Sequence, residues 1–268
     1  MGERKFSIGE AIGFGWETMK GNMGFFIVLL LVLGAINIGP CIITNMFKAA
    51  AKLNEGSETG SAGFTWGMLL LAILVSLGGS VLHVITSMGI IRITLKMCDG
   101  EKALFSDLFS CLHLFFKFLG ASLLCALIVV PAVGVPVVIW IIAAAVTGVS
   151  VKLISAVASL LVIPGIYLAI RLWIVGYCVV DKGLGPVQSL IKSFALTRGS
   201  AGALFLFALS LGFINLVGAL CLLVGLFATI PTSYVAMAFV YRKLREADED
   251  SGAVISPGHE WGSGVSPA

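Results

Sequence analysis

Long apolar runs, separated by short charged or glycine-rich stretches, occupy most of the chain. Six of them are predicted to be membrane-spanning helices, at about 24–43, 66–91, 116–135, 156–180, 202–222 and 226–241. A helix needs about 20 mostly apolar residues to cross a bilayer, which most of these runs approach or exceed. The stretch 131–165 contains Pro131 and Pro136, and we expect either a kinked continuation of the third span or a partly re-entrant segment.

Amphipathic segments precede the first, third and fifth spans, at 7–20, 105–120 and 185–199. The first begins with Ser7 and Glu10, which fit a capping box. The last, GPVQSLIKSFALTRG, has Val187, Leu190, Ile191 and Phe194 at helical spacing. Helices of this kind lie along a membrane surface. We therefore expect an interfacial helix before each pair of spans.

A short motif is repeated: LGAIN at 33–37 and LGFIN at 211–215. Related residues also end successive units, with Asp99, Asp181 and Arg242 each following a span. The sequence thus predicts three tandem units, about 5–100, 101–183 and 184–245, each made of a surface helix and a two-span hairpin. The expected fold is an all-α, polytopic transmembrane helical bundle of about six spans over 1–245. Residues 246–268 are expected to form a disordered cytoplasmic tail.

Composition and charge placement support this assignment. The chain is 59% hydrophobic and 12% charged, against about 25% charged residues in soluble domains. Of its 17 Lys and Arg, only Lys48, Lys52 and Lys152 fall outside when the N-terminus is cytoplasmic, and Arg171 falls within a span. This bias predicts a multi-pass protein of the cytoplasmic (inner) membrane with both termini in the cytoplasm. The net charge of +3 gives no indication of nucleic-acid binding.

Three polar residues within the spans are predicted to hold helices together. Asn37 and Asn215 occupy equivalent positions in the repeat, where they are expected to face each other across the bundle. His83 shares a helix face with small residues, among them Ser80 and Ser87. Interhelical hydrogen bonding suits all three better than ligand or metal binding.

Arg171 is the one basic residue predicted to lie well inside a span. Exposure to lipid tails would cost about 2.5–3.5 kcal/mol, so its side chain must snorkel, pair or face a polar cavity. Snorkelling to the cytoplasmic headgroups is one interpretation. The other is a site in which Arg171, Lys20 and Arg198 bind a lipid phosphate.

Motifs for catalysis or cofactor binding are not found in the sequence. It contains no P-loop, no G-x-S-x-G and no H-E-x-x-H, and its 6 Cys include no C-x-x-C pair. The 14 acidic residues fall in loops, surface helices, span ends or the tail, whereas ion-coupled transporters usually keep one near the midplane. No catalytic residue, metal site or cofactor is therefore predicted.

Several stretches resemble a broad bacterial family of uncharacterised integral-membrane proteins. They are SIGEAIGFGWETMKGN, IPGIYLAIRLWIV, and VVDKGLGPVQSLIKSFALTRGS followed by VGLFATIPTSYVAMAFVYRKL. The family is similar to the membrane domain fused to some glycerophosphoryl diester phosphodiesterases. The resemblance covers most of 5–245 and implies a cytoplasmic-membrane protein connected with lipids. It implies no hydrolase activity, since the soluble phosphodiesterase barrel is absent from this sequence.

The function expected from these observations is that of a non-enzymatic membrane module, either a scaffold or a lipid-associated protein. Its expected partners are membrane lipids, anionic phospholipids among them. A transporter or facilitator of a small or amphipathic solute is the first alternative, supported by the hairpins, the prolines and the intramembrane Asn and Arg residues. An intramembrane lipid-modifying enzyme is the second.

Overall fold

The computed structural model describes residues 6–55, 61–146, 163–221 and 225–254, and these residues form helices and turns without any strand. The all-α prediction is confirmed. The elements are α1 (Ile8–Gly21), α2 (Met23–Glu55), α3 (Ala62–Cys98), the 3₁₀ turns η1 (Phe105–Leu108) and η2 (Leu112–Leu114), α4 (Phe115–Val146), a helical stretch at 163–172, α6 (Val175–Lys182), α7 (Pro186–Leu196), α8 (Ala201–Leu220) and α9 (Leu226–Val254).

Five helical segments of the described chain are long and apolar enough to cross a membrane. They are Met23–Asn54, Ala62–Cys98, Phe105–Val138, Ile163–Lys182 and Ala201–Leu220. They match five of the six expected spans and fit a multi-pass membrane protein. The sixth expected span, 226–241, lies in α9 and is not among them, because charged residues occupy the C-terminal half of that helix.

Several element boundaries differ from the sequence prediction. The first span was expected to end at 43, but α2 continues to Glu55 because the alanines and lysines after Phe47 are good helix formers. Segment 105–114 forms two 3₁₀ turns instead of a surface α-helix. Asp107 explains this difference: it accepts the backbone N–H of Leu104 at 2.9 Å and pairs with Lys96 at 2.6 Å, which ties the segment to α3.

Other differences concern helix ends and the proline-containing stretch. Ser7 is the N-cap residue of α1, but its side chain makes no capping hydrogen bond, so the expected capping box is wrong. α4 runs through Pro131 and Pro136 to Val146, as expected for a continued span; residues 147–162 lie outside the described chain. α9 extends past the domain boundary at 245 as far as Val254, and only residues 255–268 of the predicted tail lie beyond the described part.

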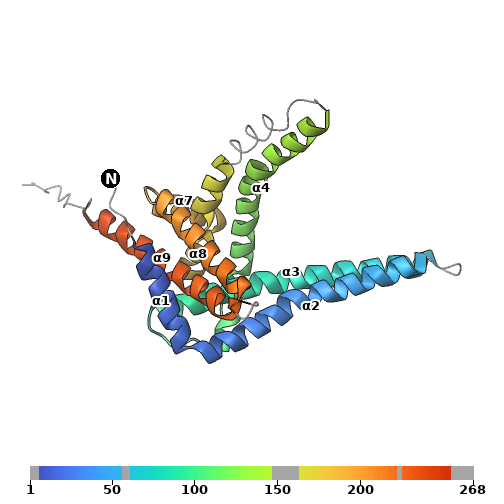
Figure 1. Ribbon diagram of the computed structural model, residues 1–268, viewed down its shortest axis with the longest axis horizontal. Helices are drawn as coiled ribbons and strands as arrows, with labels where there is room; N and C mark the ends of the chain where they lie inside the picture. The colour runs from blue at the N-terminus through green and yellow to red at the C-terminus, as the bar shows by residue number, and fades with distance from the viewer. Residues whose placement is uncertain (1–5, 56–60, 147–162, 222–224, 255–268) are drawn as a thin grey trace, which may run out of the picture.

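The helices are arranged as a body with two projecting arms (Figure 1). α2 and α3 lie side by side in a long hairpin that leaves the body in one direction. α4 forms the other arm, and the two arms diverge. The body contains α1, α7, α8 and α9, and its core is built largely from α6 and α9, with Ile174, Val179, Val240, Tyr241 and Leu244 almost fully buried. Each arm is consequently apolar and exposed along most of its length.

Helix α1 packs along α9 with one face, and apolar side chains outside that contact remain partly exposed. Ala11, Gly15 and Met19 are its buried residues, whereas Trp16 is 44% exposed. A Cβ on Gly15 would lie 2.5 Å from the carbonyl oxygen of Thr232. The contact between α1 and α9 therefore depends on the missing side chain at this position.

One arginine in the middle of α9 joins this helix to the C-terminal ends of α3 and α6. Arg242 of α9 pairs with Asp181 of α6 at 3.0 Å and also with Asp99 at the end of α3. Asp181 in addition accepts hydrogen bonds from Tyr241 at 2.8 Å and Arg245 at 2.9 Å. The three residues that end the predicted repeat units thus meet in a single ion-pair network.

The C-terminal part of α9 is held by further ion pairs. Lys182 contacts Glu249 at 3.0 Å and Lys192 contacts Asp248 at 2.7 Å, which joins α9 to α6 and α7. The hydrogen bond from Lys182 lowers the pKa of Glu249 below its ordinary value. These contacts explain why the acidic segment after Arg245 remains helical.

Replacing Gly15 by Ala tests the contact between α1 and α9. We expect the variant to lose about 1–3 kcal/mol of stability, since a methyl group against a backbone oxygen overpacks the site. Gly13→Ala is the matched control: a Cβ there has no neighbour within 4 Å, and the better helix former should add up to about 1 kcal/mol. Unfolding in mixed detergent micelles measures both. Equal stability of the two variants would contradict the packing described.

Replacing Asp181 by Asn tests the ion-pair network. We expect a loss of about 3 kcal/mol in the free energy of unfolding, because Arg242 and Arg245 would be left with a weakened partner in a half-buried site. Glu246→Gln removes the exposed pair with Lys243, at 3.2 Å, and should cost no more than about 1 kcal/mol. A similar small loss in both variants would show that the network does not hold the body together.

Candidate functional site

A cavity of about 630 Å³ lies where α3, α4, α6, α8 and α9 meet. Most of its lining is apolar, and the polar groups among the lining residues are Ser87, Ser122, Tyr177, Asn215, Ser233 and Tyr234. Trp173 and Tyr234 are each 41% exposed, so the cavity opens to the outside of the helix bundle. The described residues that line it carry no charge.

A second cavity of about 620 Å³ adjoins the first on the side of α2. Asn37, His83 and Thr86 contribute its polar groups, and Ser87, Ile90 and Tyr234 line both cavities. The side chain of Tyr234 therefore lies at the junction of the two. We call the pair the "junction cavity"; each half has the volume of an ordinary small-molecule site.

The polar groups at the α2 end of the junction cavity form a pair between the helices of the first hairpin. The amide of Asn37 donates to the carbonyl of Leu33 at 2.7 Å, and its Oδ1 lies 2.6 Å from Nδ1 of His83. Because an amide oxygen only accepts, Nδ1 of His83 is the donor. In a neutral ring Nε2 is then left as an acceptor.

Asn215 makes the corresponding contact in the third hairpin. Its Nδ2 donates to Ser233 Oγ of α9 at 3.0 Å, and that hydroxyl donates to the carbonyl of Thr229 at 2.8 Å. The Oδ1 of Asn215 is buried and has no partner within the described chain. A buried acceptor left unpaired costs about 1–3 kcal/mol, so a ligand with a hydroxyl or amine could pair with it favourably.

The two asparagines do not bond to each other, although the repeat suggested that they face each other. Each contacts the opposite helix of its own hairpin, His83 on α3 for Asn37 and Ser233 on α9 for Asn215. The reason is geometric: within a hairpin the partner helix lies directly alongside, whereas α2 and α8 belong to different parts of the fold (Figure 1).

Arg171 contacts the C-terminal end of α7. Its guanidinium donates to the Phe194 carbonyl at 2.5 Å, to Thr197 Oγ1 at 3.1 Å and to Tyr167 OH at 3.2 Å, and it lies 4.8 Å from the centre of the Phe194 ring. The unpaired carbonyls at a helix end attract a cation. Pairing within the protein therefore satisfies Arg171.

The other two residues of the predicted phosphate site lie apart from this contact. Lys20 is at the end of α1, where its ammonium lies 5.8 Å from the Trp16 ring, and Figure 1 shows that end of α1 well away from α7. Arg198 follows α7 directly, and its backbone N–H donates to Ala195. The structure does not bring the three together, and a phosphate site at Arg171 and Arg198 stays a prediction.

Tyr234, one of the three residues shared by both halves of the cavity, was not expected from the sequence to contribute to a site. The available signal was the pair Ser233–Tyr234 within an apolar run after Pro231. All six cysteines are free thiols. Across the described ranges no three His, Cys, Asp or Glu side chains lie close enough together to hold a metal ion.

A double-mutant cycle tests the pair between Asn37 and His83. We expect Asn37→Leu and His83→Leu each to lower the free energy of unfolding, with a coupling energy of about 0.6–1.7 kcal/mol, the range for interhelical hydrogen bonds in membranes. Asn45→Leu is the control on the same helix, since the amide of Asn45 reaches only Cys41 Sγ at 3.6 Å. A coupling energy of zero in mixed-micelle unfolding would rule out this pair.

Comparison with known proteins yields no match: no family model, no curated protein and no solved structure matches this chain. The family resemblance of residues 5–245 therefore stays a prediction. The junction cavity and its uncharged polar groups are the features from which a role can be inferred.

Proposed function

We propose that this membrane protein is a lipid-associated module that acts by binding and catalyses no reaction. Its site is the junction cavity, which holds a membrane lipid with the acyl chain against the apolar wall. The polar part of the lipid contacts the groups around Tyr234. The observation that carries the proposal is a large, outward-opening cavity whose polar groups are all uncharged.

The chemistry of the lining suits a lipid. Pockets for amphipathic molecules combine a mostly apolar surface with a few placed polar groups. The hydroxyl of Tyr234 can donate to an ester carbonyl, whereas that of Ser87 already donates to the His83 carbonyl at 2.7 Å and can only accept. Oδ1 of Asn215 can accept from a hydroxyl or an amine of the headgroup. The two most buried carboxylates of the described chain, Asp107 and Asp181, are already paired outside the cavity.

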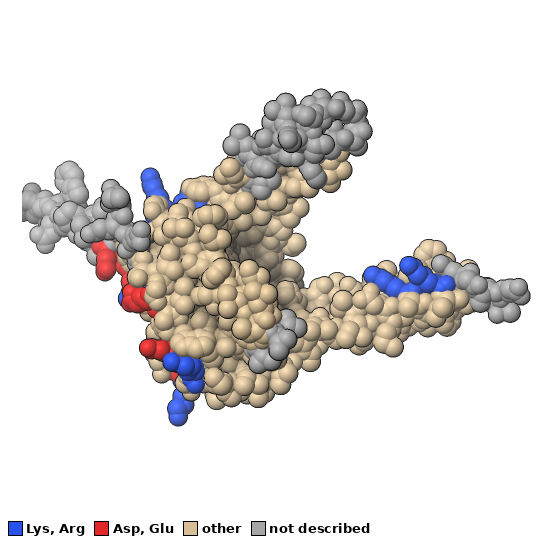
Figure 2. All heavy atoms as spheres, viewed as in Figure 1, with Lys and Arg blue, Asp and Glu red and all other residues tan. Residues whose placement is uncertain are grey.

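The distribution of charge supports a location in the cell membrane with the body at the cytoplasmic side. Figure 2 shows acidic side chains, together with lysines and arginines, at the outer edge of the body, while on the face in view the described parts of both arms show no charged side chain until the far end of the α2–α3 hairpin. That end carries Lys48 and Lys52. Both termini would then be cytoplasmic, as the positive-inside rule favours.

Filling the cavity tests the proposal. We expect native mass spectrometry of the protein in mild detergent to find a retained lipid, and Gly212→Trp to lose it, because Gly212 lines the cavity and a side chain there meets open space. Gly202→Trp is the matched control on the same helix, since a Cβ at Gly202 also has no neighbour within 4 Å. Lipid retained equally by both variants, or absent from the wild type, would refute the proposal.

A further inference from the structure

We propose that the α2–α3 hairpin guides the polar head of a lipid between the two leaflets, so that the protein promotes transbilayer lipid movement. The inference rests on the proposed function, because the path begins at the junction cavity. The inference adds a path along which the lipid moves away from that site and the point at which the path ends.

The hairpin carries two further cavities that continue the junction cavity toward its far end. One, of about 510 Å³, shares Asn37 and His83 with the junction cavity. The next, of about 500 Å³, shares Thr44, Lys48, Ser76 and Ser80 with the one before it. Together they form a continuous series of hollows, which we call the polar track, from Tyr234 to Lys48.

The hollows of the polar track together have the length of a bilayer core, although on α3 the lining beyond Ser76 is apolar. It begins at Ser87 in the junction cavity and ends beside Trp66, which lines the last hollow. These residues are 21 positions apart in α3, or about 31 Å at 1.5 Å per residue, close to the 30 Å of a hydrocarbon core. Trp is a residue typical of the membrane–water interface. The track therefore reaches from one leaflet to the far boundary of the other.

The side chains of the track are unusual for helices that face lipid. Asn37, Lys48, Ser76, Ser80 and His83 are all exposed, and the buried hydroxyl of Thr44 has no partner in the described chain. Uncovered polar groups are costly in hydrocarbon. A lipid headgroup with its water would provide donors and acceptors along the whole path, and its tails would remain among the exposed apolar residues on either side.

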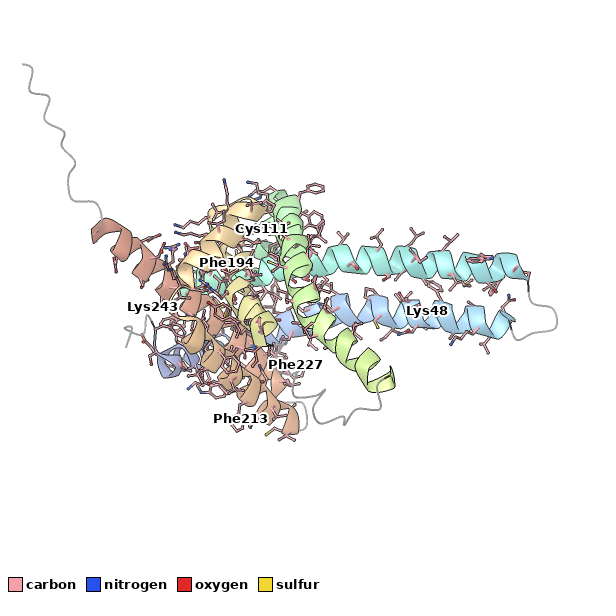
Figure 3. The ribbon with its side chains drawn as sticks, turned by 90° about the horizontal axis from the view of Figure 1, so that it is seen from above. Lys48, Cys111, Phe194, Phe213, Phe227 and Lys243 are labelled. Atoms are coloured by element: carbon pink, nitrogen blue, oxygen red, sulfur yellow. The ribbon has the colours of Figure 1, made fainter. Side chains whose placement is uncertain are left out.

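The charge of the residues that line the hollows favours a phospholipid as the molecule that occupies them. Lys48 is the one charged side chain that lines the hollows, and no acidic residue accompanies it within their described lining. Figure 3 shows Lys48 far out on the hairpin, with Lys243 on the opposite side of the body. A cation at the far end of the track suits a phosphate. A second copy of the chain over the same face would instead bring two Lys48 side chains to the same depth without a counter-charge.

Transbilayer movement can be measured with the purified full chain in phosphatidylcholine vesicles that contain a trace of NBD-labelled phosphatidylcholine. Dithionite bleaches only the outer leaflet, so protein-free vesicles retain about half their fluorescence. We expect wild-type vesicles to lose nearly all of it. Ser80→Leu should slow the second half of the decay by about tenfold, the effect of one lost hydrogen bond at the barrier.

Ser210→Leu is the matched control. Ser80, which is exposed, and Ser210, which is partly exposed, both donate to the carbonyl four residues earlier, at 2.9 and 2.8 Å, but Ser210 lines none of the four hollows described above. The control should bleach like the wild type. Equal rates in both serine variants would overturn the assignment of the track as the path.

Two other outcomes separate this inference from the proposed function. Half-bleached wild-type vesicles, with a lipid still retained in native mass spectrometry and lost in Gly212→Trp, would overturn transbilayer movement and leave lipid binding intact. Absence of a retained lipid would refute the proposed function itself. A dimer cross-linked through Cys41, which lines the track, in a Cys221→Ser background would show that a second copy covers it and would also overturn the inference.

Discussion

The pairing of Arg242 with two carboxylates holds α3, α6 and α9 together, and the arrangement of the rest of the protein depends on this contact. Its guanidinium contacts Asp181 of α6 and Asp99 at the end of α3, so the ends of α3 and α6 meet the middle of α9 at one point. Removing a charge from such a half-buried group is costly, because the remaining charges lose their partners but stay partly desolvated. The arms carry few buried residues of their own and diverge from the body (Figure 1). The relative positions of the arms therefore depend on the ion pairs that join α3, α6 and α9.

The polar side chains within the predicted membrane spans are stabilised by hydrogen bonds inside the protein. Asn37, His83, Asn215 and Arg171 all have partners within the protein, as expected where no water is available to satisfy them. What distinguishes the α2–α3 hairpin is that several of its polar side chains remain exposed despite these bonds. An exposed polar face in hydrocarbon implies a polar occupant, and the continuity of the hollows from Tyr234 to Lys48 gives that occupant a path.

Lipid binding and transbilayer movement make different demands on the same structure. Binding needs only the junction cavity, whose walls are mostly apolar and whose polar groups are neutral. Movement needs in addition a series of hollows with polar groups that crosses the hydrocarbon core. Neither requires a catalytic group. The two demands can be separated by substitution, because Gly212 lines the junction cavity alone and Ser80 lines only the two further hollows.

The all-α fold, five of the spans and the general position of α1 and α7 could be predicted from the sequence, because helix formation and membrane insertion depend on the local pattern of apolar residues. The same pattern marked Asn37, Asn215, His83 and Arg171 as polar residues in need of partners. The identity of those partners follows from the packing of the helices: His83 and Ser233 for the asparagines, and the end of α7 for Arg171. Only the tertiary structure brought Tyr234 to the junction of two cavities and Gly15 against Thr232. Such contacts join residues far apart in the chain, and their choice depends on the packing of whole helices, which no local pattern contains.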